Sequence, residues 1–324
     1  MSAAPRRVRA YAPASIGNFA AGFDLLGGAL APLDGSLLGD QVRLEAARED
    51  TFRVTGPFAA LLEAEPRKNL VVGAYELYRA RLRALELPCG PFAITLDKRL
   101  PLNSGLGSSA SSIVATLAGL QALCGHALGD RELLELAGQA EGIYSGAPHW
   151  DNVAPSLLGG LRLRVPGEGD THAVRGLPWP QDLVLAVVHP EFELPTALSR
   201  AALPSLWPLG GLVAFAENLA AFTLALHTGD RALLARCLKD PVAEPHRAGL
   251  VPGFHAAKAA ALQAGALGCS LSGSGPSLFA VASSPALAGA AAEAMLAGFA
   301  RAGLGAQAWL CALDLQGARI LSWS

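Results

Sequence analysis

The sequence has little of what marks several common classes of protein. Its five cysteines stand far apart and form no pair with zinc or redox spacing, so buried, reduced thiols are expected. Lysine and arginine number 25 against 27 aspartates and glutamates, and they are scattered, so no basic field that would hold nucleic acid is predicted. No run of about 18 apolar residues occurs, and the basic N-terminus precedes no apolar core of signal-peptide length. These absences favour a cytoplasmic protein with no nucleic-acid or membrane partner.

The 324 residues suggest about two domains. Alanine and leucine supply most of the 52% apolar content, and since alanine suits either face of a helix, the helical periodicity is weak. The turn-rich segment 166–181 is expected to link the two domains. Strands are predicted over 8–13, 41–47, 51–56, 91–98, 159–165, 182–190, 266–272, 277–283, 306–314 and 319–323. Helices are predicted over 69–87, after 108, from 130, twice within 210–238, and over 252–264 and 285–302.

Residues 101–112, PLNSGLGSSASS, form a glycine- and serine-dense loop that opens onto an apolar helix. The first turn of a helix leaves backbone N–H groups unpaired and carries partial positive charge, and small residues let a polyanion approach the backbone. The loop has no lysine, so it is not a Walker A motif. Ser108 and Ser109 stand where a hydroxyl could cap the helix or ligate Mg²⁺. Phosphate binding is favoured over a serine-capped loop, because capping needs only one of the small residues.

Polar residues also interrupt apolar surroundings elsewhere. Asn18 and Asp24 lie in a turn-like stretch, residues 13–24, that suits either a ligand-wrapping loop or ordinary turn chemistry. Glu141 falls on the inward face of the helix from 130 and therefore needs a partner. That partner is either Mg²⁺, shared with Ser109, or an internal salt bridge or water at the edge of the protein.

Four further segments offer groups for recognising a charged ligand. His149, Asp151 and Asn152 crowd what the sequence indicates is a loop. Thr196 and Arg200 are four residues apart, and Arg247 lies in a proline-punctuated loop, so two guanidiniums are available to clamp a carboxylate or phosphate. A second Gly/Ser turn within 271–281 allows close approach of a phosphate or of two backbones.

Together these segments resemble the GHMP kinases over nearly the whole chain. The three family motifs correspond, in order, to PASIGNFAAGFDLLG, PLNSGLGSSAS and SLSGSGPSLFAV. The segments AEGIYSGAPHWDNVAPSLLGG, PTALSR and EPHRAGLVPGF resemble the branch of the family that phosphorylates L-homoserine. Asn103 stands where the middle motif has glycine, and asparagine tolerates positive φ, so the loop shape is expected to survive.

The resemblance implies an α+β, two-domain GHMP kinase fold. Residues 1–165 would form an ATP-binding domain of ribosomal protein S5 domain 2 type, and residues 166–324 a ferredoxin-like domain. ATP would lie in the cleft between them. The implied reaction moves the γ-phosphoryl group of ATP, with Mg²⁺, to the side-chain hydroxyl of L-homoserine, on the route to threonine. A homodimer is also implied.

The resemblance also assigns roles to individual residues. Ser109 and Glu141 would hold Mg²⁺, Arg200 and Arg247 the substrate carboxylate, and Asp24 its ammonium. Asn18, His149 and Asn152 would orient the rest of the substrate, with Thr196 near the reacting phosphate. The nucleotide would lie against Asn69, Lys98, Pro101, Leu102, Asn103, Ser104, Gly105, Leu106, Gly107, Ser108, Ser109 and Ala110.

Two questions stay open at the level of sequence. Either Asp151 or Asn152 could occupy the place of the aspartate that some relatives are thought to use as a base. If that place belongs to Asn152, catalysis would rest on alignment, Mg²⁺ and the helix dipole. The alternatives to a homoserine-directed enzyme are a kinase of the same family for mevalonate or a sugar, and a non-catalytic nucleotide-binding relative.

Overall fold

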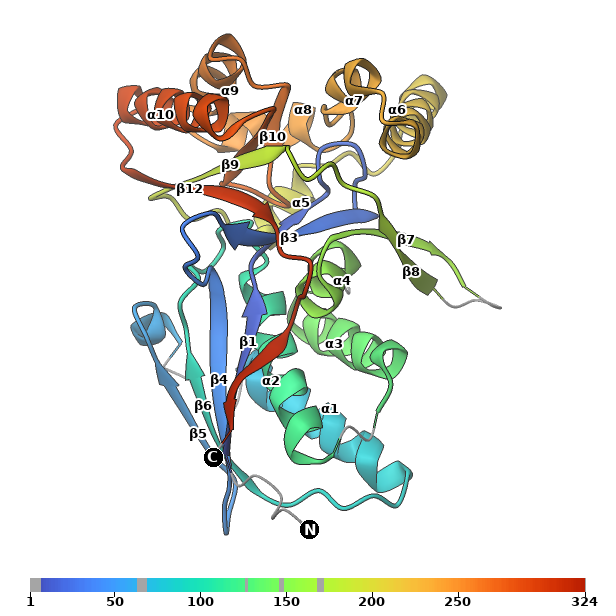
Figure 1. The fold of residues 1–324 in the computed structure, drawn as a ribbon, viewed down its shortest axis with the longest axis vertical. Helices are drawn as coiled ribbons and strands as arrows, with labels where there is room; N and C mark the ends of the chain where they lie inside the picture. Colours follow the sequence, from blue (N-terminus) through green and yellow to red (C-terminus); the bar gives the residue numbers. More distant parts are fainter. Residues whose placement is uncertain (1–6, 63–68, 126–127, 146–148, 168–171, 324) are drawn as a thin grey trace.

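The computed structural model describes residues 7–62, 69–125, 128–145, 149–167 and 172–323. Two sheets organise these residues, one below the other in Figure 1. The five-stranded sheet has the order β13 (Arg319–Trp323), β1 (Arg7–Pro13), β4 (Gly39–Ala46), β6 (Phe92–Asp97) and β5 (Thr51–Thr55). Its pairs are antiparallel except for the parallel β5–β6 pair.

The second sheet has eight strands and runs across the middle of the molecule (Figure 1). Its order is β10 (Gly268–Leu271), β11 (Leu278–Ala282), β9 (Val184–Pro190), β12 (Ala306–Leu313), β3 (Leu26–Pro32), β7 (Leu161–Pro166) and β8 (His172–Leu177), with β2 (Ser15–Gly17) paired to β3. The two sheets do not correspond to the predicted division at residue 165. The strands β3 and β7 come from the N-terminal half of the chain but belong to the eight-stranded sheet, whereas β13, at the C-terminal end, belongs to the five-stranded sheet. The two-domain boundary stays a prediction.

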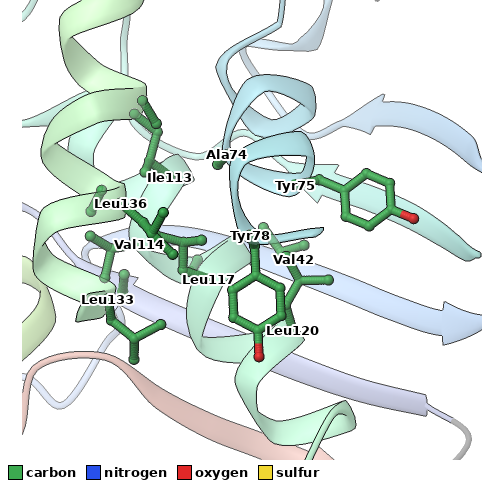
Figure 2. Close-up of a cluster of buried hydrophobic side chains, with 14 of the residues drawn as sticks. Val42, Ala74, Tyr75, Tyr78, Ile113, Val114, Leu117, Leu120, Leu133 and Leu136 are labelled. Atoms are coloured by element: carbon green, nitrogen blue, oxygen red, sulfur yellow. The ribbon is translucent and has the colours of Figure 1, made fainter. Parts of the chain in front are cut away.

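Four helices lie against one face of the five-stranded sheet or beside it (Figure 1). They are α1 (Leu70–Ala84), α2 (Ser108–Leu123), α3 (Asp130–Ser145) and α4 (Trp150–Leu158). Nearly all of α2 is buried because its neighbours on both sides are apolar. Figure 2 shows Ile113, Val114 and Leu117 of α2 meeting Tyr78 of α1 and Leu133 of α3. Such burial stabilises the fold by roughly 1.5–3 kcal/mol per large side chain. This core therefore holds α2 in place between its neighbours.

The remaining helices surround the second sheet. They are α5 (Thr196–Ala201), α6 (Leu209–Thr228), α7 (Arg231–Cys237), α8 (Glu244–Arg247), α9 (Phe254–Gln263) and α10 (Pro285–Arg301), with a 3₁₀ turn at Ala248–Leu250. Another 3₁₀ turn, Ala59–Leu61, follows β5 of the five-stranded sheet. Among the described residues, α6 alone is long and apolar enough to cross a membrane, with a mean hydropathy of 1.6, which by itself is weak evidence for a span. The five cysteines are free; Cys237, Cys269 and Cys311 are buried, as predicted, whereas Cys89 and Cys124 are only partly buried.

Most predicted elements are confirmed, and the overall α+β class with them. Segment 166–181, predicted to be a linker, is instead partly the strand β8, which pairs with β7. His149, Asp151 and Asn152 were predicted in a loop, but the helix α4 begins at Trp150. Pro155 inside that helix hid it, because proline normally ends a helical pattern.

Candidate active site

The glycine- and serine-rich loop ends at the N-terminus of α2, as the sequence predicts. Three of its residues have left-handed backbone: Asn103 with φ 51°, Gly105 with φ 75° and Gly107 with φ 64°. The tolerance expected of asparagine at position 103 is thus confirmed. Gly107 precedes the first helical residue, and no side chain caps α2. Ser108 instead donates to the carbonyl of Leu100. The first turn of α2 is therefore left to a ligand or water rather than to a serine cap.

A buried ion pair supports this loop from beneath. Lys98, 1% exposed, pairs with Asp40, 0% exposed, and also donates to the carbonyl of Ser108 (2.9 Å) and the hydroxyl of Ser112 (3.0 Å). These contacts use all three ammonium donors. Lys98 therefore lies under the loop and does not line the cavity, and its place near the nucleotide stays a prediction. Sequence reasoning missed Asp40, which also accepts the backbone N–H groups of Arg99 and Leu100.

The turn between β10 and β11 joins the other two motifs. Ser272 donates to the carbonyl of Gly105 (2.6 Å), and Ser277 donates to the carbonyl of Ser104 (2.6 Å). The backbone N–H of Gly273 donates to the carbonyl of Gly17 (3.0 Å). A Cβ on Gly105 would lie 2.3 Å from the Ser272 carbonyl oxygen, so glycine is required there. Close approach of two backbones, one of the two interpretations of this second Gly/Ser turn, is thus observed.

One cavity gathers most of the predicted site residues. Gly273 and Ser274 also line it and were not among the predicted site residues. The predicted residues that line it are Asn18, Asp24, Asn103, Ser104, Gly105, Gly107, Ser108, Ser109, Ala110, Glu141, His149, Asp151, Asn152, Thr196, Arg200 and Arg247. The predicted residues that do not line it are Asn69, Lys98, Pro101, Leu102 and Leu106. Of these, Asn69 caps α1 by accepting the N–H of Val71 (3.0 Å).

The start of α4 brings two polar side chains into the cavity. Asp151 accepts the backbone N–H of Asn18 (3.1 Å), and Ser15 donates to the side-chain oxygen of Asn152 (3.0 Å). A Cβ on Gly17 would lie 2.4 Å from the Asp151 carboxylate, so the first motif packs directly against α4. Burial, with the nearby charge of Asp24, raises the pKa of Asp151 to about 7.

Glu141 and Ser109 provide the oxygens that a divalent cation would need. Burial, with the charge of Asp151, raises the pKa of Glu141 to about 7, because removing the carboxylate from water disfavours its ionised form. Among the described residues, no group of three or more His, Cys, Asp or Glu could hold a metal. Mg²⁺ commonly binds through one or two protein oxygens together with substrate phosphates and water, so this pair fits that ion.

The opposite wall of the cavity holds two arginines. Arg200 pairs with both carboxylate oxygens of Asp24 (3.1 and 2.8 Å). Arg247, 3% exposed, donates to the carbonyls of Ser199 and Gly273 (3.1 Å each). Both guanidiniums lie over the ring of Phe23, at 5.7 and 5.5 Å from its centroid. Sequence reasoning missed Phe23, although its place beside Asp24 was the available signal.

Two other predicted substrate residues have distinct surroundings. The side chain of Asn18 accepts the N–H of Asp24 (3.0 Å) and donates to the carbonyl of Gly273 (3.2 Å). Its amide therefore connects the loop that holds Asp24 to the turn between β10 and β11. Burial lowers the pKa of His149, which keeps its imidazole neutral near pH 7. Thr196, the first residue of α5, lies 3.5 Å from the Ser274 hydroxyl. The cavity thus joins a phosphate-type loop, three carboxylates and two arginines.

Family models match both halves of the chain. Residues 69–160 match the N-terminal domain of GHMP kinases, and residues 219–301 match the C-terminal domain of GHMP kinases. The chain is also similar to the homoserine kinase of Cytophaga hutchinsonii ATCC 33406, with 35% identity, a TM-score of 0.90 and 99% of each chain covered. The chain belongs to the GHMP kinase family. Its fold is the family's two-part α+β architecture, and it is a small-molecule kinase that uses ATP.

More distant members of the family share the fold. A putative homoserine kinase from Listeria monocytogenes has 22% identity and a TM-score of 0.68, covering 97% of this chain and 99% of that one. L. major mevalonate kinase, solved in complex with R-mevalonate, has 18% identity and a TM-score of 0.66, covering 95% of both chains. These two likenesses bear on the fold alone.

The raised pKa of Asp151 makes stability depend on pH. A carboxyl whose pKa is raised by folding contributes stability that is fully present below its unfolded pKa, near 3.8, and is lost as pH rises through about 7. The free energy of unfolding should fall from pH 5 to 7, and Asp151→Asn should reduce that slope by about 1 kcal/mol per pH unit. Urea denaturation without Mg²⁺, repeated between pH 5 and 7, measures the free energy of unfolding of each protein. Exposed Glu293→Gln is the control, and an unchanged slope in Asp151→Asn would contradict the assignment.

Proposed function

We propose that this chain transfers the γ-phosphoryl group of ATP to the side-chain hydroxyl of L-homoserine. The observation that carries the proposal is that two arginines, Arg200 and Arg247, and the carboxylate of Asp24 line the same cavity as the phosphate-type loop. An amino acid is a zwitterion, and it needs cations for its carboxylate and an anion for its ammonium. The 35% identity to a homoserine kinase over the full chain also supports this substrate.

Binding of the zwitterion would redistribute the charges already present. Asp24 and Arg200 pair with each other in the structure. The substrate carboxylate would join Arg200 and Arg247, while its ammonium would join Asp24, so that every charge keeps an opposite partner. Phe23 would hold both guanidiniums in place. Asn152, His149 and the braced Asn18 loop would then direct the hydroxyl toward the phosphate loop.

The transfer itself rests on alignment. The substrate oxygen attacks the γ-phosphorus, the bond to the β–γ bridging oxygen breaks with its electron pair going to ADP, and the hydroxyl proton passes to water as ADP leaves. The first turn of α2 and the loop backbone would receive the phosphates, and Thr196 would lie beside the reacting group. Mg²⁺, held by Ser109 and Glu141, would supply neutralising charge. We further propose a role in threonine synthesis, and the expected homodimer and cytoplasmic location remain predictions.

Another kinase of the family is the nearest alternative. A mevalonate or sugar kinase would share the loop and the Mg²⁺ ligands. However, neither mevalonate nor a neutral sugar carries an ammonium for Asp24. Intact Ser109 and Glu141 also argue against a binding module without turnover.

A coupled assay of ADP release tests the proposal. Protein, MgATP and one acceptor are combined, with L-homoserine, mevalonate, galactose and no acceptor run in parallel. ADP release that depends on L-homoserine alone is the expected result. Release with a different acceptor would keep the family and refute the substrate, whereas release with no acceptor at all would indicate ATP hydrolysis.

Asp151→Asn separates a base from a positioning residue. The loose transition state of phosphoryl transfer depends mainly on alignment and charge, so this variant is expected to retain appreciable turnover of L-homoserine. A general base contributes about 10²- to 10⁴-fold. Steady-state kcat for Asp151→Asn and Asn152→Ala measures the difference. A fall of about four orders of magnitude or more in Asp151→Asn would refute this interpretation.

A further inference from the structure

A second concavity is lined by residues of β1, β4, β5 and β6. These strands belong to the five-stranded sheet, and α1 and α2 lie on one side of that sheet (Figure 1). Residues of β1 and β4 alternate, with Val8, Val42 and Leu44 buried in the core while Arg9 and Arg43 are exposed. The concavity has a volume of about 720 Å³, which is within the usual size of a small-molecule site. It shares no lining residue with the active-site cavity.

The strand register places three guanidiniums in one row across this face. Arg9 of β1 is directly opposite Arg43 of β4, which is opposite Thr95 of β6. Thr95 is in turn paired with Arg53 of β5. Like charges directly opposite each other in a sheet repel and destabilise it. The arrangement therefore costs stability unless something negative lies between the arginines.

Few acidic side chains are present to offset this row. Glu45 pairs with Arg7 and lies 3.5 Å from Arg43, and Asp97 pairs with Arg99 at 2.9 Å. Within the part of the chain that the structure describes, neither Arg9 nor Arg53 has an ion pair. The chain as a whole carries a net charge of −2, so the excess of positive charge is local to this face.

We propose that this concavity binds a small molecule bearing a doubly charged oxyanion, either a phosphate ester or a dicarboxylate. Guanidinium forks match the geometry of both groups by paired hydrogen bonds. The hydroxyls of Thr51 and Thr95 on the same lining add donors, whereas the hydroxyl of Thr55 donates to the carbonyl of Leu96. The proposal is independent of which acceptor the active site phosphorylates.

Calorimetric titration tests the site directly. The full-length protein is first saturated with a Mg²⁺ complex of a non-hydrolysable ATP analogue, so that the phosphate loop is filled, and is then titrated with inorganic phosphate or malonate. The double variant Arg9→Gln/Arg53→Gln should weaken binding by at least about tenfold. The control Arg236→Gln/Arg301→Gln removes the same charge from two exposed positions on α7 and α10, and it should change binding less than twofold.

Either ligand arm can support the proposal, and each identifies a source. If phosphate binds and the double variant weakens that binding, the natural ligand is a phosphate ester. If malonate binds in the same way, the natural ligand is a dicarboxylate. A thermal melt gives a second readout, since the double variant should lose the oxyanion-dependent rise in the unfolding midpoint while keeping or raising the midpoint without oxyanion. Binding of neither ligand, or binding that the double variant leaves unchanged, would overturn the proposal.

Discussion

Replacing Arg247 with lysine is expected to lower kcat/KM for L-homoserine by about a thousandfold. Each hydrogen bond to a charged group contributes about 1.5–3 kcal/mol, and two lost bonds give about 10²- to 10⁴-fold. The guanidinium of Arg247 already holds the carbonyls of Ser199 and Gly273 while facing the cavity. A lysine has a single side-chain nitrogen, so it cannot hold both carbonyls and also bind a carboxylate in a fork.

The split between kinetic constants identifies the cause. KM for L-homoserine should rise in Arg247→Lys while KM for ATP stays within a few fold, because the phosphate loop is untouched. Arg301→Lys, at an exposed position of α10, is the matched control and should stay within twofold. A thermal melt shows whether each variant is folded. If folded Arg247→Lys kept kcat/KM within tenfold of the parent, the carboxylate role would be wrong.

Replacing Asp40 with alanine is expected to lower the free energy of unfolding by about 3–5 kcal/mol, the usual cost of removing one partner of a buried ion pair. The ammonium of Lys98 would remain buried without its counter-charge. The backbone N–H groups of Arg99 and Leu100 would lose their shared acceptor. The first turn of α2 should loosen as well, because Lys98 holds the Ser108 carbonyl.

Equilibrium denaturation of Asp40→Ala and of two control variants, each compared with the parent protein, measures the change in the free energy of unfolding. Asp34→Ala, at an exposed turn, removes one aspartate without a buried partner and should change the free energy of unfolding by less than about 1 kcal/mol. The double variant Asp40→Leu/Lys98→Met removes both buried charges and should lose less stability than Asp40→Ala. A loss below about 1 kcal/mol in Asp40→Ala would contradict the role of the pair as a support.

The phosphate-type loop was predictable because its signal is local. Small residues at 105, 107, 108 and 109 directly precede an apolar helix, and both features lie within one stretch of sequence. Even the conformation of Asn103 followed from its residue type. Its support was not predictable, because Asp40 is 58 residues away from Lys98 and contacts it only after β4 and β6 pair.

The strand β3 was missed for a physical reason. Its sequence, LGGALAP, has glycine and alanine where β-branched residues would mark a strand. A Cβ on Gly27 would lie 1.6 Å from the carbonyl oxygen of Asp151, so glycine is needed to let α4 pack on the strand. The tertiary contact that brings Asp151 to the cavity is thus the same one that weakens the sequence signal.

Recognition of the carboxylate could be predicted only in part. The two arginines could be noticed by residue type, but the groups that orient them lie in three separate segments: Phe23 and Gly273 in turns and Ser199 in the helix α5. The ion pair between Asp24 and Arg200 spans 176 residues. No periodicity within the chain encodes such a contact, so its geometry required the folded structure.

Phosphorus NMR of the reaction product tests the central claim most directly. Transfer to the side-chain hydroxyl of L-homoserine places the phosphorus next to a methylene group, so the ester signal should be a triplet that grows in step with ADP. Phosphate on the carboxylate would give a signal without that splitting. The account predicts the triplet as the main product, and inorganic phosphate alone, or an unsplit signal, would contradict it.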